Sequence, residues 1–414
     1  MADNLSYLKQ LLNKKRTRTS TRYQYYEMKR YPQDLFLTLE TKTYNLRPVL
    51  GWCTKAVDTL ADRLQFKGWK NDNFNLNAIF KMNNSDIFFD SAILSALING
   101  CSFVYISEDG TGYPRLEVID GMNATGILDP VTNLLKEGYA VLDRDKHGKP
   151  VREAYFETGL TTFYEKGQEP YTVSNQAPAP LLVPILYRPD AKRPFGHSRI
   201  SRAMMALVDG AIRATKRSEI SAEFYSVPQK YVLGVDPDAK PIDKWRATIS
   251  SLLQITKDED GDRPTVGQFQ QQSMQPHIDQ IRTFASLFAG ESGLTMDDLG
   301  FVSDNPSSAE AIKASHESLR VLAEKAQRTF GSCFLNVGYI AACLRDNFAY
   351  ERRQFYLTEP QWMPAFKPDA AALSGIGDGA IKINQAIPGY FNTDNLVDLT
   401  GIDPSKMESV NAES

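Results

Sequence analysis

The chain has little cysteine, and none of it is paired at the CxxC spacing that marks many zinc and redox motifs. Its 414 residues contain four cysteines. These are Cys53, Cys101, Cys333 and Cys343, each within an apolar-rich segment. Isolated cysteines of this kind behave as small buried hydrophobes in a reducing compartment. We therefore expect free, buried thiols and no disulfide framework.

Long apolar runs are also missing. The longest nearly uncharged apolar stretches, 92–98 and 337–344, are far shorter than the roughly 20 residues that span a bilayer. The N-terminal sequence MADNLSYLKQLLNKKRTRTS lacks the apolar centre of a signal peptide. We expect neither export nor contact with a membrane.

The sequence has no excess of positive charge. There are 47 Lys and Arg against 50 Asp and Glu, which gives a formal net charge of −3. Proteins that bind nucleic acid tightly over their whole surface carry a clear basic excess. The charge balance argues against a sequence-specific DNA-binding protein, which is one alternative we consider, but it does not exclude a protein that lets nucleic acid pass.

Motifs for catalysis are absent or incomplete. No GxxxxGK[ST] phosphate loop occurs, and the four histidines lie too far apart for a local metal motif. The segment Gly196-His-Ser-Arg-Ile200 lacks the second glycine of a nucleophile elbow, so Ser198 is interpreted as a helix N-cap. Gly375-Ile-Gly-Asp-Gly379 follows no strand and is interpreted as a flexible hinge rather than a dinucleotide loop. We expect no enzymatic activity and no cofactor.

Two acidic segments need a separate interpretation. The run Asp258-Glu-Asp-Gly-Asp262 has its glycine at the wrong position for a calcium loop, so we expect an exposed acidic turn. Asp297, Asp298 and Asp304 share a glycine-flanked loop without a rigid scaffold or a nearby histidine in the sequence. One alternative stays open: a hydrolase that uses this Asp-rich loop or Ser198, whose activity would be lost in Asp298→Ala or Ser198→Ala.

The N-terminal half predicts helices followed by strands. Residues 9–30 are strongly basic, and form either a frayed solvated terminus or an arm at the outer rim of an assembly. Apolar steps of three and four predict a helix over 44–66, starting after Asn45 with Pro48 in its first turn, and a second over 86–99 that ends at Gly100. Short β-prone runs separated by glycine turns then predict an antiparallel meander that ends near the proline-dense 177–194; these runs are 102–106, 115–119, 139–142, 153–157 and 161–164.

The C-terminal half is mostly helical by its apolar periodicity. It predicts a helix over about 200–224, a strand over 230–233, a helix over 242–255, a charged loop over 257–263 and a helix over 276–289. A capping box, Ser307 to Glu310, opens a helix of well over thirty residues. A strand over 354–357 and a short helical tail from Asp378 complete the chain.

This order of elements resembles the portal protein family of tailed bacteriophages, siphophage type. The resemblance covers nearly the whole chain. The stretches that carry it are Tyr25-Tyr-Glu27, Asn45-Leu-Arg-Pro-Val49, Val57-Asp-Thr-Leu60, Phe66-Lys-Gly68, Gly100-Cys-Ser-Phe-Val-Tyr105, Asp109-Gly110, Pro114, Gly196-His-Ser-Arg-Ile200, Pro228-Gln-Lys-Tyr-Val-Leu-Gly234, Ser307-Ser-Ala-Glu-Ala-Ile312, Trp362 and the segment from Asp378 to Lys382. The match that begins at Ser307 is the most specific.

The resemblance implies an α+β portal fold with seven parts. They are an N-terminal α/β wing (1–198), stem helix 1 (199–226), a small α/β clip (227–272), stem helix 2 (273–292), a tunnel loop (293–306), a long wing helix with a return strand (307–366) and a short helical crown or C-terminal tail (367–414).

The family's function is implied in the same way. A portal protein forms a ring, usually of twelve identical subunits, at the unique vertex of the capsid in the virion, after assembly in the host cytoplasm. It conducts double-stranded DNA during genome packaging and ejection and is not an enzyme. Its implied partners are the terminase large subunit, the head–tail adaptor protein, and the major capsid and scaffolding proteins.

The resemblance also suggests where functional residues lie. The tunnel-loop candidates are Asp297, Asp298, Phe301, Asp304 and Asn305. The clip candidates for partner docking are Lys230, Lys244, Trp245, Arg246, Asp258 and Asp260. The stem candidates are Arg213, Lys216 and Arg217. An acidic loop suits a conduit, because a strongly basic lumen would hold DNA by counterion release; the plainer alternative is a solvent-exposed linker. Phe301, the one large apolar residue of the loop, is expected to pack on a stem helix or a neighbouring loop.

Overall fold

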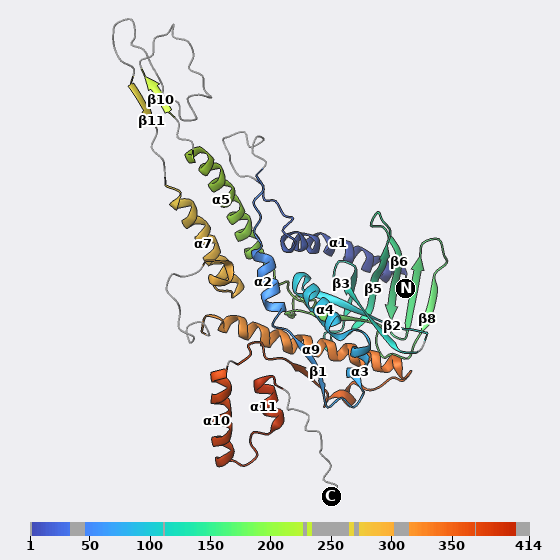
Figure 1. Ribbon diagram of the computed structural model, residues 1–414. Coiled ribbons are helices and arrows are strands. Elements are labelled where there is room, and N and C mark those ends of the chain that lie inside the picture. Colours follow the sequence, from blue (N-terminus) through green and yellow to red (C-terminus); the bar gives the residue numbers. More distant parts are fainter. Residues whose placement is uncertain are drawn as a thin grey trace.

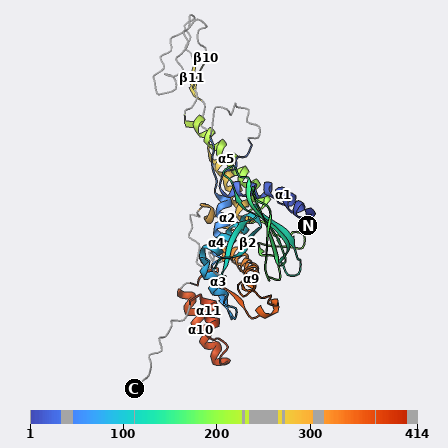
Figure 2. The ribbon, with the colours of Figure 1, turned by 90° about the vertical axis from the view of Figure 1, so that its right-hand side faces the viewer.

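The structure, a computed structural model, describes residues 2–33, 46–110, 112–226, 230–233, 265–268, 273–301, 314–368 and 370–402. A broad body of strands and helices occupies one end, and a hairpin of two long helices rises from it (Figure 1). Seen from the side, the described part is thin (Figure 2). Mixed helix and sheet confirm the expected α+β class, whereas the boundaries of the seven parts stay predictions.

Two antiparallel sheets build the body. The first has the order β3-β2-β9, from β2 (Cys101–Glu108), β3 (Pro114–Asp120) and β9 (Leu182–Leu186). The second runs in sequence order through β4 (Ala124–Leu128), β5 (Leu135–Arg144), β6 (Pro150–Glu157), β7 (Leu160–Glu165) and β8 (Tyr171–Ser174). All five expected strands are present, but the single meander is wrong.

The correction comes from a strand inside the proline-dense segment. β9 is completely buried and pairs with β2, with Pro184 opposite Phe103. Proline cannot donate a ladder hydrogen bond, and β9 tolerates it because it is an edge strand. The burial of β9 therefore draws β2 and β3 away from the meander and into a sheet of their own.

The helices of the body differ from the expectation at their ends. α4 (Ser85–Asn99) ends, as predicted, at Gly100, which adopts φ +96°. The helix expected over 44–66 is α2 (Trp52–Ala61), so Pro48 precedes it. Residues beyond it form β1 (Phe66–Lys70), which pairs with β12 (Glu359–Trp362). α3 (Leu76–Met82) then leads into α4.

The strand expected over 354–357 is also wrong. A 3₁₀ turn, η3 (Arg352–Phe355), occupies this place, and the strand β12 follows it. A capping box between Glu351 and Gln354 starts the turn. Phe355 is fully buried, stacked on Phe74 with ring centroids 3.8 Å apart. Burial of one aromatic ring against a distant segment decides the local conformation here.

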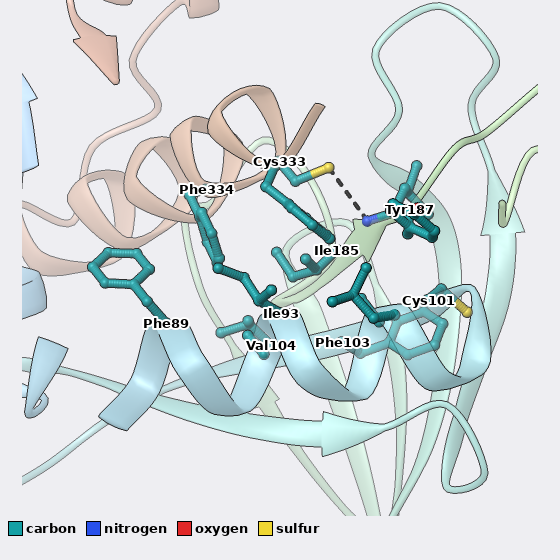
Figure 3. Packing of buried hydrophobic residues seen from close by; sticks show 14 of the residues in the cluster. Phe89, Ile93, Cys101, Phe103, Val104, Ile185, Tyr187, Cys333 and Phe334 are labelled. Atoms are coloured by element: carbon teal, nitrogen blue, oxygen red, sulfur yellow. Dashed lines mark hydrogen bonds between the residues drawn. The ribbon is translucent and has the colours of Figure 1, made fainter. Parts of the chain in front are cut away.

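The long helix α9 (Glu317–Arg345) crosses the body and supplies much of its core. Figure 3 shows Phe334 of α9 pointing toward Phe89 and Ile93 of α4, while the Cys333 sulfur points toward the end of β9. The Cys333 sulfur accepts a hydrogen bond of 3.4 Å from the Leu186 amide. All four cysteines are free and buried, as expected. The predicted opening of this helix at Ser307 lies outside the described residues.

The N-terminal segment is not a frayed terminus. It forms α1 (Ala2–Tyr26), and Leu8 and Leu12 are buried against Tyr139 and Val141 of the five-stranded sheet. The Lys9 ammonium pairs with Glu153 at 2.9 Å. The basic residues thus decorate a packed helix.

Four further elements lie outside the body. The hairpin consists of α5 (Arg202–Ser226) and α7 (Gln275–Ser292), and beyond it β10 (Lys230–Leu233) pairs with β11 (Thr265–Gln268). The expected strand over 230–233 is confirmed, while the helix over 242–255 and the loop over 257–263 fall outside the described residues.

The C-terminal helices are α10 (Ala370–Ala386) and α11 (Thr393–Thr400), on the far side of α9 from the hairpin (Figure 1). The hinge expected at Gly375 to Gly379 is wrong, because these residues are helical within α10. Among the described helices, none combines the length and apolar character needed to cross a membrane.

Candidate functional site: the helical hairpin and its junction with the body

The two helices of the hairpin are in close contact at Gly210 of α5. A Cβ atom added at Gly210 would lie 2.7 Å from the Phe284 ring of α7. Ala211 of α5 and Ala285 and Phe288 of α7 are buried nearby in sequence. Gly210 makes room for the Phe284 ring and the neighbouring side chains are buried, so α5 and α7 form one packed unit.

The three predicted stem cations lie together on α5. Arg213, Lys216 and Arg217 are spaced by three and four residues, which places them on one side of the helix, and all three are partly buried. On α7 the exposed side carries Asp279, Arg282 and other polar residues. The hairpin thus presents charges of both signs.

A buried arginine that the sequence analysis did not single out joins the hairpin to the body. Arg199 is 5% exposed. Its Nε donates to the Ala56 carbonyl of α2 at 3.2 Å, and a terminal nitrogen donates to the Ser292 carbonyl at the end of α7. Loss of hydration lowers the pKa of this guanidinium. Since its partners are backbone carbonyls, no residue type in the sequence points to this junction.

Three tyrosines of α1 form a second junction. Tyr23 donates to Asp120 at the end of β3, Tyr25 donates to both carboxylate oxygens of Asp209 at 2.9 Å, and Tyr26 donates to Asp58 of α2 at 2.9 Å. Burial and the neighbouring carboxylates raise the pKa of Tyr25 and of Tyr26 to about 12. Through Tyr25, the N-terminal helix is bonded directly to α5.

Ser198 is not the N-cap of α5, nor does it have the surroundings of a nucleophile. Its hydroxyl donates to the Ile98 carbonyl at 2.6 Å and accepts from the Ile200 amide at 3.0 Å. The cap is Ser201, whose hydroxyl accepts from the Met204 amide at 3.1 Å. Both hydrogen-bonding functions of Ser198 are therefore used by the backbone.

The described part of the predicted tunnel loop is folded onto the body. Gly293, at φ +70°, ends α7, and a short 3₁₀ turn, η2 (Asp297–Leu299), follows. Asp298 accepts from the Thr295 amide and hydroxyl, both at 2.9 Å, so this carboxylate holds the turn. Asp297 is exposed.

Phe301 and Asp298 of this loop both have neighbours elsewhere in the fold. Phe301 is partly buried and packs against the main core. His316, at the start of α9, places its Nδ1 4.0 Å from Asp298, a neighbour that the local sequence did not reveal. Asp304 and Asn305 lie outside the described residues.

The predicted clip residues lie almost entirely outside the described part of the chain. Lys230 begins β10. Lys244, Trp245, Arg246, Asp258 and Asp260 are not among the described residues. Their docking role stays a prediction. In the part of the chain that is described, no group of three His, Cys, Asp or Glu side chains is arranged to hold a metal ion.

Two portal proteins of mycobacteriophages are similar to this chain in sequence. The portal protein of Mycobacterium phage L5 is 24% identical over 331 residues, which cover 75% of this chain and 68% of that protein. The portal protein of Mycobacterium phage D29 is also 24% identical, over 337 residues and the same shares of both proteins.

Similar solved structures come from gene transfer agent (GTA) particles. One, titled "Virion of native gene transfer agent (GTA) particle", has a TM-score of 0.46 and 15% identity, and another, "Neck of empty GTA particle computed with C6 symmetry", has a TM-score of 0.48 and 14% identity. Both alignments cover 86% of this chain and 90% of the other. Both TM-scores are below 0.5, so the assignment to a family rests on sequence.

The sequence model of one family matches residues 5–365, which hold the body, the hairpin and α9. Its description is "Phage portal protein, SPP1 Gp6-like". The chain belongs to this family of phage portal proteins.

Proposed function

We propose that this chain forms a ring of identical subunits at one vertex of a phage capsid, with the twelve subunits that are usual for portal proteins. Double-stranded DNA passes through the centre of the ring. Family membership supports the portal role, and portal proteins are structural rather than enzymatic. In the ring, the α5–α7 hairpin is the stem around the channel, and the body is the wing.

The shape of the subunit is the observation that carries the proposal. The described part is broad in one view and thin in the view at right angles, with α5 and α7 side by side along its length (Figures 1 and 2). Thin subunits of this shape can stand next to one another around an axis, in the head-to-tail contacts that close a ring. The packed hairpin supplies a rigid wall, because Gly210 lets α5 and α7 meet closely.

The charges fit a conduit better than a tight DNA-binding surface. The whole chain has a formal net charge of −3. Asp297 is exposed where α7 ends. A carboxylate near passing DNA repels phosphates, whereas a cation would bind them with release of counterions. We assign the tunnel loop, with Asp297, Asp304 and Asn305, to this low-affinity lining.

The finer roles follow the family pattern. The clip, which holds β10 and β11 at the tip of the hairpin, docks the terminase large subunit during packaging and the head–tail adaptor afterwards. The body contacts the major capsid and scaffolding proteins, and the assembled ring later conducts DNA out of the virion.

A packaging assay tests the function. Heads assembled with the full chain, terminase and ATP are expected to protect DNA from nuclease, and heads assembled without the chain are expected to protect none. Protection that is independent of the chain would contradict the proposal.

A charge reversal tests the tunnel lining. Asp297→Lys is expected to slow packaging, while the matched variant Glu169→Lys, in an exposed turn of the five-stranded sheet, leaves the rate unchanged. Equal rates for both variants would exclude Asp297 from the channel without affecting the portal assignment.

A further inference from the structure

A cleft in the body, away from the α5–α7 hairpin, has no part in the function described so far. It has a volume of about 1050 Å³ and lies between one side of α9 and the turn that joins β4 to β5. Lys325, Arg328 and Ser332 line it from α9, and Val131 and Lys136 line it from the opposite side. This volume is slightly above the roughly 300–1,000 Å³ typical of ligand pockets.

The cleft collects positive charge. Four cationic side chains line it, against the single carboxylate of Asp129; they are Lys136, Lys325, Arg328 and Arg352. Within the described part of the chain, no acidic side chain forms an ion pair with any of these four cations. Like charges gathered without partners repel one another, so an anion in the cleft would be stabilised.

One of these cations is held firmly in place. Arg352 Nε donates to Asn336 Oδ1 at 3.2 Å, and the guanidinium lies 5.8 Å from the centre of the Tyr339 ring. Asn336 is 8% exposed and donates from Nδ2 to the Thr132 carbonyl at 3.3 Å. The amide thus joins Arg352 to the turn across the cleft.

The partners of Arg352 leave its charge uncompensated. Burial lowers the pKa of the guanidinium. An amide oxygen and an aromatic ring are neutral partners, and a partly desolvated cation gains most from an anion with which it can form two parallel hydrogen bonds. A carboxylate suits this fork, because Arg and carboxylate groups pair in one plane.

The lining also contains apolar surface. Val131 is 86% exposed and Pro189 is also exposed, whereas Leu134, Ala179 and Leu186 line the cleft with 8% or less of their surface exposed. Duplex DNA presents phosphates on a convex surface and has no apolar side chains to cover these residues. An extended peptide can place acidic groups on the cations and apolar side chains on this surface at the same time.

We propose that this cleft binds an acidic peptide segment of another protein, with carboxylates on Arg352, Arg328 and Lys325 and apolar side chains beside Val131. The site is separate from the DNA channel and does not depend on it. It gives the wing a docking function of its own.

Fluorescence anisotropy with the purified full chain tests the proposal. The probe is a short labelled peptide of alternating glutamate and leucine, compared with a lysine–leucine peptide and a short labelled DNA duplex. We expect the glutamate peptide to bind and the lysine peptide not to bind. The double variant Lys325→Glu/Arg328→Glu should weaken binding by roughly tenfold or more, since both lost charges face the ligand, and Arg352→Gln should also weaken it.

The matched control is Lys146→Glu/Lys192→Glu, which reverses two exposed charges outside the cleft. All of these positions except Arg352 are exposed, and thermal melting shows whether each variant is folded. If the control variant loses as much binding, the peptide is attracted by the overall charge of the protein and not by the cleft, and the proposal is overturned. Tighter binding of the duplex than of the peptide would also overturn the proposal. So would the absence of peptide binding, which is the result expected if another copy of the chain fills the cleft.

Discussion

At the scale of single residues, hydroxyl and carboxylate pairs hold α1 in place. Tyr25 is 7% exposed and shares its proton with both oxygens of Asp209. Tyr25→Phe leaves this carboxylate without its donor, so we expect the free energy of unfolding to fall by about 1–3 kcal/mol. Denaturant unfolding measures the change. The control is Tyr171→Phe, where the lost hydrogen bond to Glu165 is exposed and little change is expected; equal effects would contradict the account.

The raised pKa values of Tyr25 and Tyr26 predict a loss of stability in alkaline solution. Their ordinary pKa is 10.0, and in the folded chain the pKa of Tyr25 and of Tyr26 is about 12. Between these values the unfolded chain loses protons that the folded chain keeps, so stability is full below pH 10 and falls as the pH rises toward 12. The double variant Tyr25→Phe/Tyr26→Phe is expected to show a shallower decline in urea unfolding across this range. An unchanged slope would mean that these hydroxyls titrate alike in both states.

The cysteines give a third prediction at this scale. Burial raises the pKa of Cys101 and of Cys333 to about 11, from an ordinary 9.0. Since the thiolate is the reactive form, both should be inert toward a thiol reagent near neutral pH. A colorimetric thiol assay should detect them only after unfolding, and rapid labelling of the native chain at either position would contradict their burial.

At the scale of elements, the contact between α5 and α7 depends on one missing methyl group. Gly210→Ala brings a Cβ within 2.7 Å of the Phe284 ring. Overpacking of this kind is destabilising by typically about 1–3 kcal/mol. The matched variant is Gly290→Ala on α7, where a Cβ meets no atom within 4 Å; it should raise stability by roughly 0.5–1 kcal/mol, because alanine favours a helix over glycine. Thermal unfolding of both variants compares them, and a stabilising Gly210→Ala would show that the helices can separate.

The elements also show where sequence is informative. α4 and its end at Gly100 were predictable, because periodicity and a C-cap glycine are local signals. β1 was not, because Phe66 leaves the helical pattern to pack against Trp362, with ring centroids 4.9 Å apart. In α10 the glycines carry no local penalty large enough to break the helix, so the expected hinge was wrong.

In the candidate site too, some features could be predicted from the sequence and others could not. Helices α5 and α7 and strand β10 follow from the sequence pattern. Their assignment to a stem and a clip comes from the resemblance to portal proteins and stays a prediction. Arg199 could not be found in this way, since its partners are backbone carbonyls of Ala56 and Ser292, far apart in the sequence. Asp298 was expected to face a channel, yet part of its hydrogen-bonding capacity is used by Thr295.

At the scale of the whole molecule, the proposed function makes this subunit a sector of a ring. Arg199 and Tyr25 bond the hairpin to the body, so these two parts can move only together or by breaking largely buried polar contacts. The cleft beside α9 is basic and lies away from the hairpin, and we propose it as a separate docking surface. Together, the two proposals assign DNA passage to the hairpin and protein docking to the body, which are separate parts of one subunit.

Negative-stain imaging of the purified full chain, together with its mass in solution, tests the central claim most directly. The account predicts closed rings with a central hole wide enough for a DNA duplex, and a mass that is a multiple of the 46.4 kDa subunit. Well-folded particles that stay at the mass of one subunit under assembly conditions, with no ring in the images, would contradict it.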